Sequence, residues 1–335
     1  MFSPIRNISW ESERTKRVSM GMVILAVLAA ALGFRQLTPF IFDGLVVVLV
    51  WFATYEIFNA KRLDEKGVKD YYFYPYVAIA YLTFLLGILV ATPFVWWLHV
   101  VLQVVLVFVL CIYVYLMSYS DKDFVKECKL KKVELGKASL GVVREYLKVL
   151  LYPAFLLFLL IPINHLDRWA SISISGTVEA VTLLPLMALL LIFIISMFTD
   201  TAAFVVGRLM KGQWKLCPKI SPGKTWAGAI AGLFGGVIGA LLVVMVMTTN
   251  PVIQAFLTER IGYSTTVIIV TIAVGLVGSI LNQAGDIYAS WLKRRCGIKD
   301  FSKLIPGHGG IMDRLDGVIW VASFIFVLML PLVFV

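Results

Sequence analysis

The chain has 335 residues, of which 60% are hydrophobic and 15% are charged, and its mean hydropathy is +0.91. Soluble domains are about 45–50% apolar and about 25% charged, so the composition excludes an ordinary soluble protein. It predicts an all-α, polytopic transmembrane helical bundle. The cysteines are scattered without a C-x-x-C pair, which argues against a zinc site or a disulfide framework; they are Cys111, Cys128, Cys217 and Cys296.

Nine apolar runs approach or exceed the roughly 20 residues that a helix needs to cross a bilayer. In chain order they cover residues 18–34, 38–58, 73–91, 93–117, 146–163, 178–199, 226–249, 264–281 and 317–335. The first run follows a basic stretch and is interpreted as a retained helix rather than a cleaved signal peptide. We therefore expect about nine transmembrane helices.

The basic residues predict the orientation of these helices. Of the 30 lysines and arginines, 27 fall in the N-terminal arm and in alternate connectors, and only Arg35, Arg168 and Arg260 fall on the other side. The positive-inside rule then places the N-terminus in the cytoplasm and the C-terminus outside. The formal net charge of +10 is thus mainly a topology signal, and we expect a multi-pass protein of the cell (inner or plasma) membrane with no nucleic-acid partner.

Chemically informative residues concentrate in the second half of the chain. Residues 1–145 are predicted to form transmembrane helices and connectors of unassigned role, including a charged amphipathic helix over 120–137. Residues 146–335 are predicted to form the catalytic region, with its active site on the cytoplasmic face in segments 200–225 and 282–316. In the first half, Asp43 and Glu56 lie near the ends of an apolar run, where snorkelling or pairing makes a charge inexpensive.

Segment 200–225 contains a carboxylate and a phosphate-binding candidate. Asp200 directly follows an apolar run, so it is expected at the membrane interface. The stretch Ser221-Pro-Gly-Lys224-Thr225 is typical of a turn followed by a helix start, where free N–H groups and a lysine can bind phosphate. A plain helix-start turn is the alternative for this stretch.

Segment 282–316 contains the carboxylates with the most suggestive spacing. If the apolar run before it continues as a helix, Asp286, Ser290 and Lys293 share one face. Asp313 and Asp316 share a face at the start of the last helix, where capping is their alternative role. Carboxylates that can hold magnesium, beside cations that can hold phosphate, indicate phosphoryl or nucleotidyl transfer.

A glycine-rich loop and several cations complete this segment. Gly307-His308-Gly309-Gly310 can bring backbone N–H groups close to an anion, and His308 is a candidate acid or phosphate donor. The nearby basic residues serve both topology and phosphate binding; they include Arg294, Lys299 and Arg314.

The same residues resemble the signature of phosphatidate cytidylyltransferases (CDP-diacylglycerol synthases). The matching run is Ser290-x-Leu292-Lys293-Arg294-x4-Lys299-Asp300-x-Ser302-x2-Ile305-Pro306-x-His308-Gly309-Gly310-Ile311-x-Asp313-Arg314-Leu315-Asp316. Upstream, Gln283-x-Gly285-Asp286, Asp200-Thr-x-Ala-Phe and Ser221-Pro-x-Lys224-Thr225 are also similar. Two positions depart from the pattern: Ala227 stands where Glu or Gln is usual, and Gly317 where a serine commonly follows.

The resemblance implies transfer of the cytidylyl group of CTP to phosphatidic acid, which gives CDP-diacylglycerol and pyrophosphate. It implies dependence on Mg2+, with a second, monovalent ion such as K+ left open. The expected metal ligands are Asp286, Asp313 and Asp316. The expected catalytic residues are Asp286, Lys293, Arg294, His308, Asp313 and Arg314. The expected substrate-binding residues are Asp200, Ser221, Lys224, Thr225, Ser290, Lys299, Gly309 and Gly310.

Three alternatives remain at this stage: a membrane transporter, a scaffold that binds anionic lipids, and a catalytically impaired relative, the last suggested by Ala227. The glycines between Gly228 and Gly239 allow close helix packing, either within the chain or across a homodimer.

Overall fold

The apolar runs fold into helices in a computed structural model that describes residues 5–35, 37–62, 76, 78–82, 95–167, 178–210, 214–305 and 309–334. The helices of the first half are α1 (Ile5–Phe34), α2 (Phe40–Ala60), α4 (Val95–Ser120), α5 (Lys122–Leu130) and α6 (Leu135–Val149). A π-helical turn, η3 (Leu150–Phe155), leads into α7 (Leu156–Phe158) and α8 (Leu160–Asn164). The second half contains α10 (Val178–Leu209), α11 (Trp226–Met247), α12 (Pro251–Ile261), α13 (Ser264–Arg295) and α14 (Met312–Phe334).

Within the described residues, seven helical stretches are long and apolar enough to cross a membrane. Each overlaps one of the nine predicted runs, although some extend well beyond it, such as Leu135–Asn164 for the run 146–163. The run 18–34 lies in α1, whose apolar part, Ser19–Phe34, is shorter than these seven. Most of the run 73–91 lies outside the described residues. The chain is therefore a multi-pass α-helical membrane protein, and the count of nine stays a prediction.

One short hairpin interrupts the helical architecture. Strands β1 (Lys215–Cys217) and β2 (Ser221–Thr225) pair antiparallel, with Lys215 opposite Thr225 and Cys217 opposite Ser221. The prediction of a turn at 221–225 was therefore wrong, because these residues are held extended by pairing with β1. The predicted helix start is confirmed: α11 begins at Trp226, and the Thr225 hydroxyl accepts the Gly228 N–H as its cap.

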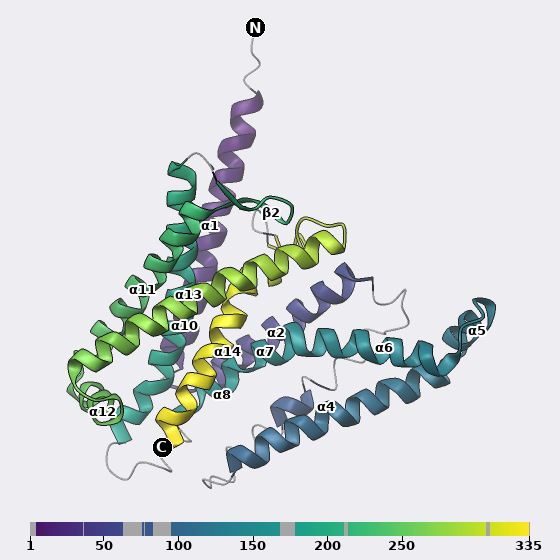
Figure 1. Ribbon diagram of the computed structural model, residues 1–335, viewed down its shortest axis with the longest axis horizontal. Coiled ribbons are helices and arrows are strands. Elements are labelled where there is room, and N and C mark those ends of the chain that lie inside the picture. Colours follow the sequence, from purple (N-terminus) through teal and green to yellow (C-terminus); the bar gives the residue numbers. More distant parts are fainter. Residues whose placement is uncertain are drawn as a thin grey trace.

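Helices α10, α11, α13 and α14 pack together as a bundle (Figure 1). A row of glycines on α11 makes the α10–α11 contact close: Gly228, Gly232, Gly235, Gly236 and Gly239 are all buried. A Cβ atom on Gly235 would lie 2.5 Å from the Phe198 carbonyl oxygen of α10. The glycines thus serve packing within the chain, as one of the two predicted alternatives states.

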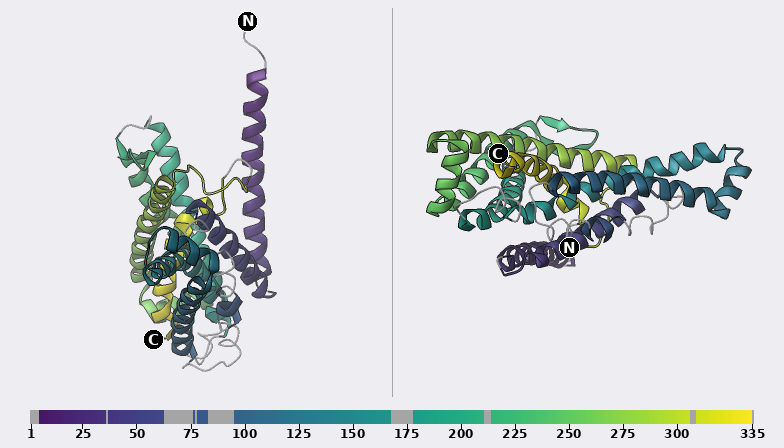
Figure 2. Two further views of the ribbon diagram at one scale, coloured as in Figure 1. Left: turned by 90° about the vertical axis from the view of Figure 1, so that its right-hand side faces the viewer. Right: turned by 90° about the horizontal axis from the view of Figure 1, so that it is seen from below.

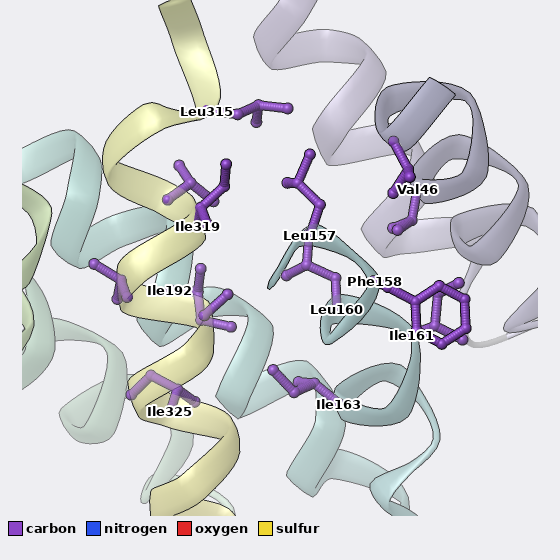
Figure 3. Close-up of a cluster of buried hydrophobic side chains, with 14 of the residues drawn as sticks. Val46, Leu157, Phe158, Leu160, Ile161, Ile163, Ile192, Leu315, Ile319 and Ile325 are labelled. Atoms are coloured by element: carbon purple, nitrogen blue, oxygen red, sulfur yellow. The ribbon is translucent and has the colours of Figure 1, made fainter. Parts of the chain in front are cut away.

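The apolar core joins the two halves of the sequence. Figure 3 shows Val46 of α2 near Phe158 and Ile161 of α7 and α8, with Ile192 of α10 and Ile319 of α14 across from them. The predicted boundary between the two halves, at 145/146, falls inside α6. The two halves therefore share one core, and the boundary does not divide the protein into two separately packed domains. The stretch from α6 to α8 bends at Tyr152, which has non-helical φ −134° and ψ 111°, just before Pro153.

A buried polar network ties the start of α2 to the end of α8. The Asp43 carboxylate lies 2.8 Å from His165 Nε2 and accepts a 2.9 Å hydrogen bond from Asn164. Arg35 donates to Asn164 at 2.8 Å and lies 3.4 Å from Asp167. Burial lowers the pKa of the Arg35 guanidinium, and the Asp167 carboxylate opposes that shift. Asp43 is therefore paired inside the protein, which is one of the two alternatives predicted for it.

The elements that bear the candidate residues gather at one end of the molecule. The start of α1, the β1–β2 hairpin and the end of α13 lie toward one end, whereas α12 and the end of α14 lie toward the other (Figures 1 and 2). This arrangement agrees with the alternation of basic connectors. Which end faces the cytoplasm stays a prediction.

Candidate active site

Helix α13 carries three of the predicted site residues on one face. It runs without interruption from the apolar stretch into the charged segment and ends at Arg295. The Ser290 hydroxyl donates to the Asp286 carboxylate at 3.4 Å, and Lys293 follows on the same face, where Ser290 and Lys293 are both buried. The predicted helical phase of Asp286, Ser290 and Lys293 is thus confirmed.

Lys224 links the hairpin to α13. Its ammonium group lies 2.7 Å from the Asp286 carboxylate and donates to the Gln283 carbonyl oxygen at 3.3 Å. The Asp286 side chain remains 37% exposed in this pair and that of Lys224 20% exposed. Because solvent reaches both groups, a phosphate or a cation can compete for either of them. The structure therefore brings segments 200–225 and 282–316 together, as the sequence predicts.

Asp313, in contrast, is enclosed. It forms a 2.6 Å ion pair with Lys293, and the side chains are 11% exposed for Lys293 and 4% exposed for Asp313. Its second oxygen accepts the backbone N–H groups of Phe301 and Gly310, each at 2.9 Å. With these three partners Asp313 organises the loop that precedes α14.

Asp200 comes to the same site from α10. This helix continues for more than two turns beyond Asp200, to Leu209, so it extends past the apolar run that ends at 199, and the position of Asp200 at the membrane interface stays a prediction. The carboxylate accepts a 2.7 Å hydrogen bond from the Asn282 side chain. Asp200 is close enough to the Asp286 carboxylate to be repelled by it, and close enough to the exposed Arg314 guanidinium to be attracted by it.

Asp316, one turn after Asp313, completes a group of three carboxylates with Asp200 and Asp286. It interacts electrostatically with both, and with Lys293. One of its oxygens accepts the Gly317 N–H at 2.9 Å. Such clustered negative charge attracts a cation.

The described residues bring no three His, Cys, Asp or Glu side chains to the distances of a ready-made metal cage. Magnesium commonly takes only one or two protein carboxylates and completes its shell with water and substrate phosphates. The accessible Asp286, with Asp316 or Asp200 beside it, fits that demand. Asp313, with its oxygens already occupied, fits it less well than the sequence implied.

The remaining candidates lie around this centre. Arg294 donates to the Ile220 carbonyl oxygen of the hairpin at 3.2 Å and to Ile298 at 3.0 Å. Lys299 is exposed, and Ser221 begins strand β2. Gly309 has φ +83°, the left-handed conformation predicted for this glycine loop. His308 lies outside the described residues.

Sequence reasoning missed two residues near the site, Glu56 and Tyr152. Glu56, in the last turns of α2, accepts hydrogen bonds from the Ser302 hydroxyl at 2.6 Å, from Ile311 N–H at 2.9 Å and from Met312 N–H at 2.8 Å. Its position near the end of an apolar run suggested an inexpensive charge, yet it is only 3% exposed. A signal for this role was absent because its partners lie more than 240 positions later in the chain.

Tyr152, at the bend before Pro153, packs edge-on against Tyr288 of α13 with ring centroids 4.8 Å apart. Its buried hydroxyl has no hydrogen-bond partner within the described part of the chain. It lies in the field of Asp286, Asp313 and Asp316. A buried unsatisfied hydroxyl calls for an explanation, and a bound water or phosphate oxygen would supply its partner.

Gly317, one departure from the signature, is explained by packing. A Cβ atom at this position would overlap the Asn282 side-chain oxygen, and Asn282 is the residue that donates to Asp200. The missing side chain therefore makes room for that contact. Ala227, the other departure, is the half-buried second residue of α11.

An apolar groove of about 610 Å³ lies against α13. Residues of α13, of α14 and of the hairpin line it; they are Ile220, Ala284, Ile287, Tyr288, Trp291 and Trp320. The stretch of α13 that carries Asp286 therefore also lines a surface suited to hydrocarbon, on another face of the helix.

Comparisons with known proteins identify the family of this chain. A sequence model of the cytidylyltransferase family matches residues 15–332. A phosphatidate cytidylyltransferase of Brucella suis is 38% identical over 135 residues, which cover 40% of this chain and 44% of that protein. One of Staphylococcus epidermidis is 41% identical over 140 residues, 42% of this chain and 45% of that protein. The matched stretch thus spans less than half the length of these relatives. The family model covers most of the chain, and the chain belongs to the cytidylyltransferase family.

Proposed function

We propose that this protein transfers the cytidylyl group of CTP to phosphatidic acid and releases pyrophosphate. The observation that carries the proposal is the Lys224–Asp286 pair, which joins both signature segments. The stretch of α13 that carries this pair also lines an apolar groove, so it offers a charged surface for a nucleotide and a hydrophobic one for lipid chains. The names of the relatives point to the same pair of substrates.

In the proposed reaction, an oxygen of the lipid phosphate attacks the α-phosphorus of CTP. The new P–O bond forms as the bond from the α-phosphorus to the bridging oxygen breaks, and pyrophosphate leaves with that electron pair. The attacking oxygen is already an anion, so no strong general base is needed. Catalysis then rests on positioning and charge compensation.

The side chains of the site divide this work. Lys224, Lys299 and Arg314 are accessible cations suited to the triphosphate and the departing pyrophosphate. Arg294 holds the hairpin against α13. Lys293 and Asp313 hold Phe301 and Gly310 before α14, and the Tyr152 hydroxyl, which has no partner among the described residues, is proposed to donate to a phosphate oxygen.

We further propose that Asp286, with Asp316 or Asp200, holds Mg2+ together with substrate phosphates. The ion would neutralise the triphosphate and polarise the α-phosphorus. A role for Asp313 as a third ligand, and for a monovalent ion, stays part of the proposal. The site is proposed to face the cytoplasm, where CTP is available.

The test is turnover by the purified protein in detergent micelles that contain phosphatidic acid, Mg2+ and CTP labelled in the cytidine. We expect labelled CDP-diacylglycerol and an equal amount of pyrophosphate. Diacylglycerol in place of phosphatidic acid is the matched control, because it lacks the attacking phosphate. A folded protein that forms no labelled lipid would contradict the proposal, and would direct attention to lipid binding without chemistry.

A further inference from the structure

Glu56 places a buried carboxylate of the N-terminal half against the loop of the signature segment. It is only 3% exposed, and all three of its partners come from the stretch between Ser302 and Met312. Two of them are backbone N–H groups at the start of α14. A carboxylate here satisfies donors that a helix start otherwise leaves unpaired, and it is favoured by the helix dipole.

Gly310 shows how closely the carboxylate fits the loop. A Cβ atom on Gly310 would lie 2.5 Å from one Glu56 oxygen and 2.7 Å from the other. Real side chains do not approach so closely, so a residue larger than glycine must displace the loop or Glu56. Gly310 therefore has no space for a side chain while Glu56 is in place.

Two carboxylates hold this loop from opposite sides. Asp313 accepts the Gly310 and Phe301 N–H groups from within the site, and Glu56 accepts those of Ile311 and Met312 from α2. Neighbouring N–H groups thus point to different carboxylates.

We propose that Glu56 is a positioning residue for the active site: it fixes Ser302 and the stretch 310–312, and thereby the placement of Asp313 and Asp316. The inference rests on the proposed function for its kinetic consequence. It gives the N-terminal half a part in the site, which the signature residues alone do not indicate. The carboxylate is expected to touch the loop and not the substrates.

Glu56→Gln is the informative substitution because its shape is nearly the same. The amide can offer one oxygen to Ser302 and Ile311, but its NH2 group then faces the Met312 N–H, donor against donor. We expect kcat to fall roughly 10²-fold, since displacements of about 1 Å at a site have effects of this order. The KM for phosphatidic acid should change less than threefold, because the apolar groove is untouched.

Asp43→Asn provides a matched control. Asp43 is a buried carboxylate of the same helix, with partners at the opposite end of α2. Its loss should lower the thermal midpoint but leave kcat per folded molecule within about twofold, because the signature loop is not touched. Equal loss of kcat in both variants would reduce Glu56 to a general stabiliser and overturn the proposal.

Hydrogen exchange gives a readout that does not depend on turnover. In Glu56→Gln, peptides covering 301–316 should exchange at least tenfold faster than in the parent, while peptides of α11 keep their rates. Unchanged exchange at 301–316 would overturn the proposal. If the parent forms no CDP-lipid, the proposed function fails, and the exchange result alone decides whether Glu56 fixes the loop.

A double-mutant cycle with Gly310→Ala tests the contact itself. The added methyl should impair kcat strongly when Glu56 is present and much less in a Glu56→Ala background, where the space is free. Additive effects of the two substitutions would contradict the observed proximity of Glu56 to Gly310. If both single variants fail to accumulate, the double variant Glu56→Asp with Gly310→Ala is used instead. The shorter aspartate keeps the negative charge but withdraws the carboxylate from the added methyl group, so kcat should be partly restored.

Discussion

At the residue scale, the carboxylates of the site differ in how firmly they are held. Asp286 shares one accessible ion pair with Lys224, whereas Asp313 is enclosed by Lys293 and two backbone N–H groups. A group that exchanges partners easily suits transient binding of metal or phosphate. A group with all partners fixed suits the shaping of a loop.

Asp286→Asn and Asp313→Asn should therefore fail in different ways. We expect Asp286→Asn to lose activity at least about 10²-fold, by loss of charge at the reacting centre, with little change in its thermal midpoint. Asp313→Asn should lose activity and also unfold at lower temperature. Turnover with labelled CTP and thermal unfolding in the same detergent check both statements; near-normal turnover of Asp286→Asn would remove it from the metal site.

Lys293→Met should be strongly destabilising. Removing one partner of a buried pair leaves an uncompensated charge, which costs about 3–5 kcal/mol, although the two N–H groups on Asp313 reduce that loss. Lys137→Met breaks an exposed pair with Glu134, with side chains 79% and 67% exposed, and should cost less than about 1 kcal/mol. Denaturant unfolding of both variants measures the difference, and equal effects would show that the Lys293 pair is not buried in solution.

Tyr152→Phe tests the unsatisfied hydroxyl. Without substrate, the substitution removes no hydrogen bond within the described residues. The free energy of unfolding of the variant should therefore be unchanged or slightly higher than that of the parent. If the hydroxyl donates to a substrate phosphate, kcat/KM for CTP or for phosphatidic acid should fall about tenfold, in line with roughly 1.5 kcal/mol for a hydrogen bond to a charged group. Unchanged kinetics with both substrates would assign the hydroxyl to water.

The sequence alone indicated the local relations of the site but not its distant ones. Asp286, Ser290 and Lys293 could be placed on one face because helical periodicity relates positions close in the chain. The pairing of Lys224 with Asp286 was expected only in outline. Glu56 could not be found, because nothing in a single sequence connects it with Ile311, which is 255 positions later.

At the scale of elements, α13 joins membrane and chemistry in one rigid piece. The apolar stretch and the residues Asp286 and Lys293 belong to the same uninterrupted helix. The sequence predicted this continuity. Helix α10 likewise extends past its apolar run, which ends at 199, and reaches Leu209; Asp200, directly after that run, pairs with Asn282. The hairpin was missed because its strands are three and five residues long.

The close approach of α10 and α11 predicts a severe effect of Gly235→Val. Its Cβ atom would lie 2.5 Å from the Phe198 carbonyl oxygen and 2.6 Å from the Ala202 side chain, so the helices must separate. Overpacking of this kind costs typically about 1–3 kcal/mol. Gly44→Ala in α2 has no neighbour within 4 Å of the new atom and should be neutral or stabilising by up to about 1 kcal/mol. Thermal unfolding of the two variants compares them directly, and a tolerated Gly235→Val would contradict the packing described.

At the scale of the whole molecule, the distribution of cations predicts which end faces the cytoplasm. Cys217 lies in the hairpin, and Tyr263, at the start of α13, is 85% exposed at the opposite end. We expect a membrane-impermeant maleimide to label a Tyr263→Cys variant, otherwise free of cysteine, in intact cells. A protein that retains only Cys217 should react after permeabilisation alone. The reverse pattern would invert the predicted orientation.

The two carboxylates of α2 also have a consequence for how the protein is made. Asp43 accepts from Tyr81, 38 positions later, and pairs with Asn164 and His165, 121 and 122 positions later. The partners of Glu56 are all 246 or more positions later in the chain. A ribosome delivers α2 to the insertion machinery long before it has synthesised the partners of Glu56. The second helix must therefore enter the bilayer with that carboxylate still unmatched, and only the segment that leads into α14 completes it. Biogenesis of this protein depends on one of its last segments to finish one of its first.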